Sequence, residues 1–419
     1  MPKTDTIAGT VHEISRKGFT HQFGAPQVEV GDDPTWAKVR DVGTRLWLDT
    51  GDIEIARNLW CSQFEALTTN NTLLNKEIQK GIYDDLIKDA ASAIRGVDTS
   101  IDERRLVLEV AFVLNAYHAL RLVELFDAYV SVELHTDLAD DVERSVAYGK
   151  RYYQICPERF IVKVPLTPAG LLAARALGER GVPVNFTLGF SARQNYVAAL
   201  FAQPRYVNVF MGRLNAFVAD NELGDGTNVG EKATLATQRS LDELRRTGMA
   251  ETQLIGASMR EGSQVATLAG IDVYTMPPGV AADYREHPAK TISRQVQSDP
   301  AIDLATGISL SDFNASTLWD VPDGLVACVE QLLKKDVASS TPEDIQVHFA
   351  RAGFADFLPR WSDEDIQTVT ADGKIPVFDK WKDRLAAGEI GMDALMNVSA
   401  LRSFATDQQA LDDRIRSLI

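Results

Sequence analysis

FIVKVP, at residues 160–165, is a run of β-branched and aromatic residues that carries one lysine, Lys163, near its end. Such runs are typical of buried strands. An unpaired ammonium group is costly inside such a strand, and burial lowers the pKa of a lysine so that part of it is free amine. A free amine that faces an open site can attack a ketone and form a Schiff base. On this segment alone, a structural lysine with its head in water or paired to a carboxylate is the commoner interpretation.

Short apolar segments of this kind alternate with helical stretches over much of the chain. The eight expected strands are Leu46–Thr50, Glu65–Thr69, Ala128–Leu134, Phe160–Pro165, Val182–Leu188, Tyr206–Met211, Gln253–Ser258 and Ile271–Met276. Helical periodicity fills the intervals, for example at Ala169–Arg180 and Glu231–Thr247. Eight β/α units in series predict an α/β fold of the TIM (β/α)8 barrel type. A doubly wound open sheet is the alternative, but no Gly-rich phosphate loop follows the first strand.

The sequence also predicts how the chain is divided. We expect an N-terminal segment at 1–44, a barrel catalytic domain at 45–290 and a mostly helical C-terminal extension at 291–419. The last part of the extension, 391–419, has apolar residues at helical spacing and is expected to pack on the barrel as a terminal helix.

Within the extension, two further stretches lead to different expectations. Thr341–Phe357 is expected to be a helix that starts at Thr341-Pro342-Glu343-Asp344. Ile308–Trp319 has no safe assignment.

Composition restricts the class of protein. With 45% hydrophobic and 24% charged residues, the 419-residue chain is typical of a globular protein, and its net charge of −16 argues against a nucleic-acid or acidic-membrane partner. Cys61, Cys156 and Cys328 show no paired spacing, which indicates a reducing compartment. We find no signal-peptide pattern and no run that approaches a membrane span, so a cytoplasmic location is expected. The six histidines form no tight cluster, so a metal site is not expected.

Polar side chains gather where the expected strands end, which is where the chemistry of TIM barrels lies. They are Asp49, Thr68, Thr69, Asn70, Glu133, Lys163, Asn185, Thr187, Asn208, Arg213, Ser258 and Arg260. Carboxylates, a lysine, amides and two arginines on successive strand ends indicate a Schiff-base enzyme that acts on a phosphorylated carbonyl compound.

Each of these residues also has a structural interpretation. Asp49 fits a turn or cap, and Asn70 fits the cap of the next helix. Glu133 fits a structural partner of Lys163. The two arginines fit the protein surface, where most arginines lie.

Seven segments resemble motifs of the transaldolase family. They are LWLDTGD (46–52), ALTTNNTLL (66–74), VSVELHTDL (130–138), IVKVPLTPAG (161–170), VPVNFTLGFS (182–191), VFMGR (209–213) and IGASMR (255–260). SFATDQQALDDRI (403–415) is similar to the terminal helix of full-length transaldolases. The resemblance covers roughly 45–280 and about 391–419 of the chain.

The resemblance implies a catalytic role for four residues. Lys163 matches the lysine that attacks C2 of a ketose phosphate, and Asp49 matches the acid/base that takes the proton of the C4 hydroxyl. Glu133 and Thr187 match the pair that holds a water used in proton transfer. A three-carbon dihydroxyacetone unit would then stay on Lys163 as an enamine while the aldose phosphate leaves.

The resemblance also implies which residues bind the substrate. Asn70 and Asn185 match the amides that bind hydroxyls of the dihydroxyacetone unit. Asn208 and Phe210 stand at neighbouring positions of the same substrate-binding site. Arg213, Ser258 and Arg260 match the phosphate site, for which the planar fork of arginine is well suited. No metal or organic cofactor is implied.

Three positions depart from the family pattern. Asn71 stands where the family usually has proline, Asn208 where it usually has serine, and Gly189 where it usually has a bulkier apolar residue. The region 281–390 is also longer and different. These departures leave the identity of the sugar pair open, because substrate fit depends on such contacts.

The function that the resemblance implies is the transfer of dihydroxyacetone between sugar phosphates in the pentose phosphate pathway. The donor would be a ketose phosphate such as sedoheptulose 7-phosphate or fructose 6-phosphate, and the acceptor an aldose phosphate. A fructose-6-phosphate aldolase-like enzyme is one alternative, but such enzymes tend to carry glutamine and tyrosine where this chain has Glu133 and Phe210. A catalytically idle phosphosugar-binding barrel is the other. Small sugar phosphates are the expected partners, without nucleic acid or membrane, for a monomer or homodimer.

Overall fold

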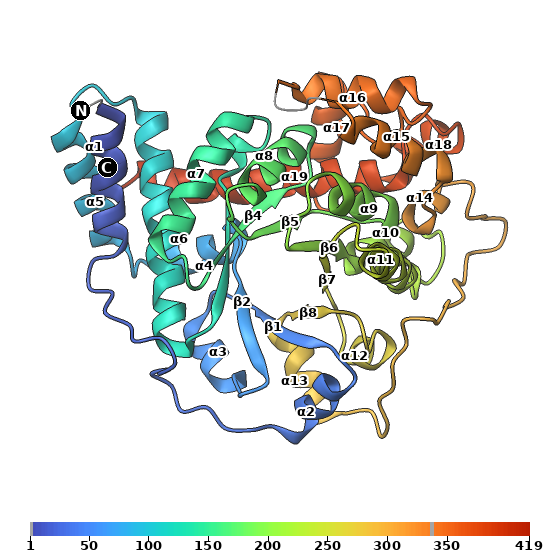
Figure 1. Cartoon of the computed structure of the whole chain (residues 1–419), viewed down its shortest axis with the longest axis horizontal. Coiled ribbons are helices and arrows are strands. Elements are labelled where there is room, and N and C mark those ends of the chain that lie inside the picture. Colours follow the sequence, from blue (N-terminus) through green and yellow to red (C-terminus); the bar gives the residue numbers. More distant parts are fainter. Residues whose placement is uncertain (1–2, 336–338) are drawn as a thin grey trace.

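Eight parallel strands form a closed barrel in the computed structural model, which describes residues 3–335 and 339–419 (Figure 1). The strands pair in sequence order, and the last pairs with the first. They are β1 (Arg45–Asp49), β2 (Phe64–Thr68), β3 (Tyr129–Glu133), β4 (Phe160–Pro165), β5 (Val184–Thr187), β6 (Tyr206–Phe210), β7 (Gln253–Ala257) and β8 (Val273–Met276). The TIM-barrel prediction is confirmed, and the open-sheet alternative is excluded because the sheet closes. Every expected strand is present, with ends that move by no more than two residues.

Helices follow the strands and surround the barrel (Figure 1). They are α3 (Ile53–Leu59), α4 (Asn71–Ile78), α5 (Asp84–Val97), α6 (Glu103–Phe126), α7 (Val142–Ile155), α8 (Pro168–Gly178), α9 (Ala192–Phe201), α10 (Met211–Asp220), α11 (Val229–Arg246), α12 (Ser263–Thr267) and α13 (Pro278–Glu286). Several begin directly after a strand at a residue whose side chain accepts a backbone N–H bond, as Thr167 does at α8 and Ser191 at α9. Such caps fix the point at which the chain turns from the mouth of the barrel to its outer wall. The helices expected at 169–180 and 231–247 correspond to α8 and α11.

Two helices precede the barrel in the part of the chain that the structure describes. In the N-terminal segment, α1 (Lys3–Ser15) contacts α5, α6 and α7, and α2 (Pro34–Asp41) contacts β1.

Among the described residues, α6 alone is long and apolar enough to cross a membrane by length and composition. However, 89% of its apolar window is buried inside the fold, where α6 packs against α1, α5 and β3. This is the environment of the core helix of a globular protein.

In its described residues, the C-terminal extension contributes six helices. They are α14 (Ser316–Trp319), α15 (Asp323–Leu333), α16 (Pro342–Arg351), α17 (Asp363–Asp372), α18 (Phe378–Ala386) and α19 (Met392–Arg416). The last lies within the stretch 391–419 that was expected to be helical. In Figure 1, α19 (red) runs behind the barrel from the side of α16–α18 towards α4, and it contacts both α17 and α4. The division of the chain into domains at residues 44 and 290 stays a prediction.

The helix expected at 341–357 is wrong at its C-terminal end. Thr341 starts α16 as expected, with reciprocal side-chain bonds to Asp344, but the helix ends at Arg351. Gly353 lies two residues on with a φ of 91°, in the left-handed region that glycine favours and that ends helices. The ambiguous stretch 308–319 consists of turns followed by the short α14.

A buried ion-pair network fastens the start of α19 to the barrel. Arg193, at the start of α9, donates from Nε and Nη2 to the two oxygens of Asp393 at 2.8 and 2.7 Å. Its Nη1 donates to Asp356 at 2.7 Å, and the Ser191 hydroxyl also donates to Asp393 at 2.7 Å. Because Arg193 is 3% exposed and Asp393 0% exposed, these bidentate bonds are shielded from water.

We expect Asp393→Ala to lower the free energy of unfolding by about 3–5 kcal/mol, because it leaves the buried Arg193 without its bidentate partner. Asp413→Ala is the matched control. Asp413 lies on the same helix and pairs with Arg416, but its side chain is 63% exposed, so we expect a change within about 0.5 kcal/mol. Urea unfolding followed by circular dichroism measures both. Equal midpoints for the two variants would show that the network does not anchor α19.

Candidate active site

Lys163 lies on β4 between two polar residues of the neighbouring strands. The strand register places it beside Glu133 of β3 on one side and Asn185 of β5 on the other. Lys163 is 4% exposed, and its Nζ lies 3.4 Å from Oε1 of Glu133. The pairing of Lys163 with a carboxylate is therefore real, and the same side chain also reaches a cavity.

This cavity opens at the C-terminal ends of the strands and measures about 150 Å³. Nine of the eleven predicted site residues line it: Asp49, Asn70, Lys163, Asn185, Asn208, Phe210, Arg213, Ser258 and Arg260. These residues come from six of the eight strands or from the loop or helix start that follows them. The barrel thus gathers side chains that lie up to about two hundred residues apart in the sequence.

The other two predicted residues, Glu133 and Thr187, do not line this cavity. Oε2 of Glu133 accepts the backbone N–H of Asn71 at 3.1 Å, so the carboxylate is held between the start of α4 and Lys163. Glu133 instead lines a second cavity, of about 10 Å³, together with His135 and other residues. That space is close to the volume needed for one water molecule. Thr187 is fully buried, and its hydroxyl has no partner among the described residues.

Asp49 stands at the end of β1 and faces the cavity. Burial raises the pKa of Asp49, while the ammonium of Lys163 and a hydrogen bond from Thr68 oppose the increase. A carboxyl group whose pKa is raised towards neutrality suits general acid/base catalysis at physiological pH.

A chain of amides lies beside Lys163. The Nδ2 of Asn185 donates to the hydroxyl of Ser131 at 2.9 Å, and the Nδ2 of Asn208 donates to Oδ1 of Asn185 at 2.9 Å. Oδ1 of Asn208 is buried and has no partner among the described residues. A buried acceptor of this kind needs a donor, and a substrate hydroxyl in the cavity would supply one.

Two of the departures from the family pattern meet at this point. A Cβ atom at Gly189 would lie 2.4 Å from the carbonyl oxygen of Asn208, so only glycine allows the two backbones to approach this closely. The side chain of Asn195 also donates to that carbonyl at 2.8 Å.

Asn70 has both a structural position, as the cap of α4, and a position in the wall of the cavity. Its Oδ1 accepts the backbone N–H of Leu73 at 2.8 Å and so caps α4, as the structural interpretation expects. It also lines the cavity, where its amide nitrogen and the second lone pair of Oδ1 are left to serve a ligand.

The two arginines lie close together at one wall of the cavity. Arg213 is 7% exposed, so the interpretation of Arg213 as a surface residue is wrong. Burial lowers the pKa of Arg213 to about 10, and the charge of Arg260 adds to this effect. Burial also lowers the pKa of Arg260. In the described part of the chain, neither guanidinium forms an ion pair with a carboxylate within 4 Å.

Gly212 allows the two arginines to meet. A Cβ atom at this position would lie 2.0 Å from the carbonyl oxygen of Ser258 and 2.9 Å from Cγ of Arg260. The start of α10 therefore packs directly on the loop after β7, and the adjacent Arg213 is brought to Arg260.

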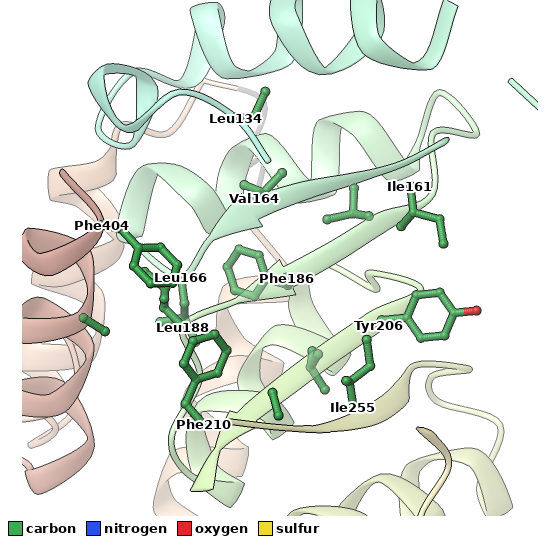
Figure 2. Close-up of a cluster of buried hydrophobic side chains, with 14 of the residues drawn as sticks. Leu134, Ile161, Val164, Leu166, Phe186, Leu188, Tyr206, Phe210, Ile255 and Phe404 are labelled. Carbon is green, nitrogen blue, oxygen red and sulfur yellow. The ribbon is translucent and has the colours of Figure 1, made fainter. Parts of the chain in front are cut away.

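The cavity has a further wall that sequence reasoning missed. Its residues include Thr72, Lys374, Phe404 and Asp407. Phe404 comes from α19, and its ring lies 6.3 Å from that of Phe210; Figure 2 shows the two rings near each other, where α19 meets the strand ends. The same ring lies 5.8 Å from Nζ of Lys163. Asp407, one turn further along α19, accepts a bond from the hydroxyl of Thr72.

The segment SFATDQQALDDRI, already matched to a terminal helix, was the available signal for Phe404 and Asp407. No comparable signal pointed to Lys374.

Comparison with known proteins agrees with this geometry. The family model for transaldolase/fructose-6-phosphate aldolase matches residues 46–318 of the chain. The chain belongs to this family. A transaldolase of Xanthomonas campestris pv. campestris (strain B100) is 30% identical over 266 residues, which cover 61% of this chain and 80% of that protein. A probable transaldolase of Nitrosopumilus maritimus (strain SCM1) is 28% identical over 251 residues, which cover 59% of this chain and 90% of that protein.

The resemblance noted in the sequence is thus confirmed, and the chain is a transaldolase-type enzyme of the transferase class. The family match ends at residue 318, so most of the C-terminal extension lies outside it.

Proposed function

We propose that this protein transfers a dihydroxyacetone unit from a ketose phosphate to an aldose phosphate through a Schiff base on Lys163. The observation that carries the proposal is the placement of a buried lysine, paired with Glu133, in the same cavity as two arginines that have no carboxylate partner among the described residues. A lysine held in this way can form a covalent imine, and the arginines suit the phosphate of the same substrate.

The chemistry would begin at C2 of the ketose. The neutral amine of Lys163 adds to the carbonyl, and loss of water gives a protonated imine. Glu133, within 3.4 Å of Nζ, is placed to exchange protons with the nitrogen during these steps, and a water held with Thr187 would carry the proton.

Cleavage would follow from the electron demand of this imine. Asp49 takes the proton of the C4 hydroxyl, the C3–C4 bond breaks, and its electron pair moves into the imine to give an enamine. The aldose phosphate leaves with a new carbonyl at the former C4. Addition of the enamine to an acceptor aldose phosphate reverses the same steps, and hydrolysis of the new imine frees Lys163 and the product ketose.

The apolar pair Phe210 and Phe404 supports transfer over simple cleavage. The Phe404 ring lies beside the lysine, Phe210 lines the same cavity, and neither contributes a hydroxyl that could activate water against the enamine. An enamine shielded from water survives until an acceptor arrives. We further propose that the substrates are soluble sugar phosphates of the pentose phosphate pathway, handled in the cytoplasm by a monomer or homodimer.

The test is a donor panel run with and without an acceptor aldehyde. With sedoheptulose 7-phosphate or fructose 6-phosphate alone, we expect release of at most about one equivalent of aldose phosphate per active site. Addition of glyceraldehyde 3-phosphate or erythrose 4-phosphate should then give multiple turnovers. Continuous release of free dihydroxyacetone without an acceptor would instead identify an aldolase. Absence of any product from every donor would indicate an idle binding barrel.

A further inference from the structure

One cation at the mouth of the cavity comes from the extension that the family match does not cover. Lys374 lies in the turn between α17 and α18 and lines the same cavity as Arg213 and Arg260. Two other lysines of this region, Lys380 and Lys382, pair with Asp372 and Asp379. Among the described residues, Lys374 forms no such pair. Its ammonium group is thus free to meet a ligand.

The turn that carries Lys374 is firmly held against the barrel. The hydroxyl of Ser399 on α19 donates to the carbonyl oxygen of Lys374 at 3.3 Å. Asn221, at the end of α10, bonds to the backbone of Pro376 at 3.0 Å and of Phe378 at 2.8 Å. The turn is therefore fixed both to α19 and to the helix that carries Arg213.

Lys374 and Arg213 are also in direct contact. Nη1 of Arg213 donates to the carbonyl oxygen of Lys374 at 3.3 Å, which is the single side-chain hydrogen bond that Arg213 makes in the described structure. The backbone of the extension thus contacts one of the two arginines, and the same residue, exposed and lining the cavity, carries a positively charged side chain. Asp407 supplies a negative charge in the same cavity, but its carboxylate already accepts the hydroxyl of Thr72.

Three cations around one cavity match an anion of more than one charge. A phosphate monoester carries about −1.5 to −2 charges near pH 7 and offers three acceptor oxygens. Two arginines can hold it through directed bonds, while a lysine acts as a mobile point charge.

We propose that Lys374 binds the terminal phosphate of the sugar substrate together with Arg213 and Arg260, so that the C-terminal extension completes the substrate site of this enzyme. The inference rests on the proposed function and adds a specificity-determining residue to it. Because Lys374 lies at the exposed rim, it acts on binding and not on the bonds that break.

Steady-state kinetics of Lys374→Gln test this assignment, with Lys374→Arg as the conservative variant. Lys382→Gln is the matched control, because it removes one positive charge from the same region at a lysine that pairs with Asp379 and does not line the cavity. Arg260→Gln gives the effect of losing one of the two arginines that line the cavity.

For Lys374→Gln we expect KM for a ketose phosphate to rise about tenfold, with kcat changed less than about twofold. The inhibition constant of inorganic phosphate should rise by a similar factor, and the dependence of KM on salt should weaken. KM for an unphosphorylated ketose should not change. Lys374→Arg should restore most of the lost affinity.

Two results would overturn the proposal. One is a KM for the ketose phosphate in Lys374→Gln that equals that of Lys382→Gln. The other is an equal rise for phosphorylated and unphosphorylated ketoses, which would leave only the structural contact between the Lys374 carbonyl and Arg213.

Direct titration of inorganic phosphate keeps this test independent of turnover. If wild-type protein shows no transfer activity, weaker phosphate binding by Lys374→Gln than by Lys382→Gln still supports the third cation, and equal binding rejects it. The reaction proposed for Lys163 is tested separately, by borohydride trapping of its imine.

Discussion

Replacing Lys163 with methionine should reduce kcat on the order of 10⁴-fold or more. Methionine fills a similar volume in β4, but it cannot form the imine that accepts the electrons of the C3–C4 bond. Glu133 keeps the backbone N–H of Asn71 at 3.1 Å but loses its cationic neighbour, so some loss of stability is also expected. Thermal unfolding of the variant shows whether the lost activity reflects chemistry or folding.

Borohydride trapping tests directly whether Lys163 forms the imine. Reduction of the imine formed with a ketose phosphate turns it into a stable secondary amine that carries a three-carbon unit, and peptide mass mapping should locate that unit on Lys163. Lys150→Met, which removes an exposed lysine of α7, should label like the wild-type protein. The mechanism is wrong if folded wild-type protein yields an unmodified Lys163 peptide, or if Lys163→Met still labels at another lysine.

The barrel could be predicted because its signals are local. Each strand is a short, mostly apolar run with polar residues in or just after its last part, as in β4, where Phe160–Val162 precede Lys163. In a closed parallel barrel all these ends face one mouth, so the sequence order of the strands was enough to bring Asp49, Lys163 and Arg260 to one cavity.

The rest of the site depends on contacts that no local pattern encodes. Lys374 belongs to a turn between two polar helices, and it reaches the cavity because Ser399 and Asn221 hold that turn. The position of Glu133 behind Lys163, instead of in the cavity wall, follows from its bond to the backbone of Asn71. Such long-range placements are visible only once the fold is known.

The sequence around the strand ends also could not predict whether the arginines are buried or exposed. Arg213 lies just past the end of a strand, and most arginines lie on the protein surface. Here the close approach of Gly212 to the loop after β7 and the cover provided by α19 bury it.

Asp49→Ala should slow carbon–carbon cleavage by about 10²–10⁴-fold while imine formation survives. The side chain of Asp49 faces the cavity that holds Lys163, but imine formation does not need the C4 proton to leave. The donor should therefore accumulate as an uncleaved imine, and borohydride should trap the whole ketose phosphate on Lys163 instead of the three-carbon unit. Asp49→Asn, which keeps the size of the side chain and a partner for Thr68, should behave in the same way because an amide cannot take the proton.

The pH profile of the wild-type enzyme provides an independent check of this role. Asp49 must be a carboxylate to accept the C4 proton, so the cleavage rate should fall as the pH drops below the pKa of Asp49. Because burial raises that pKa, this acid limb should lie at a higher pH than that of an exposed aspartate. The limb should be absent from the residual cleavage rate of Asp49→Ala, measured in single-turnover experiments. Loss of trapping in a folded Asp49 variant would instead assign the residue to imine formation, and cleavage would then need another base.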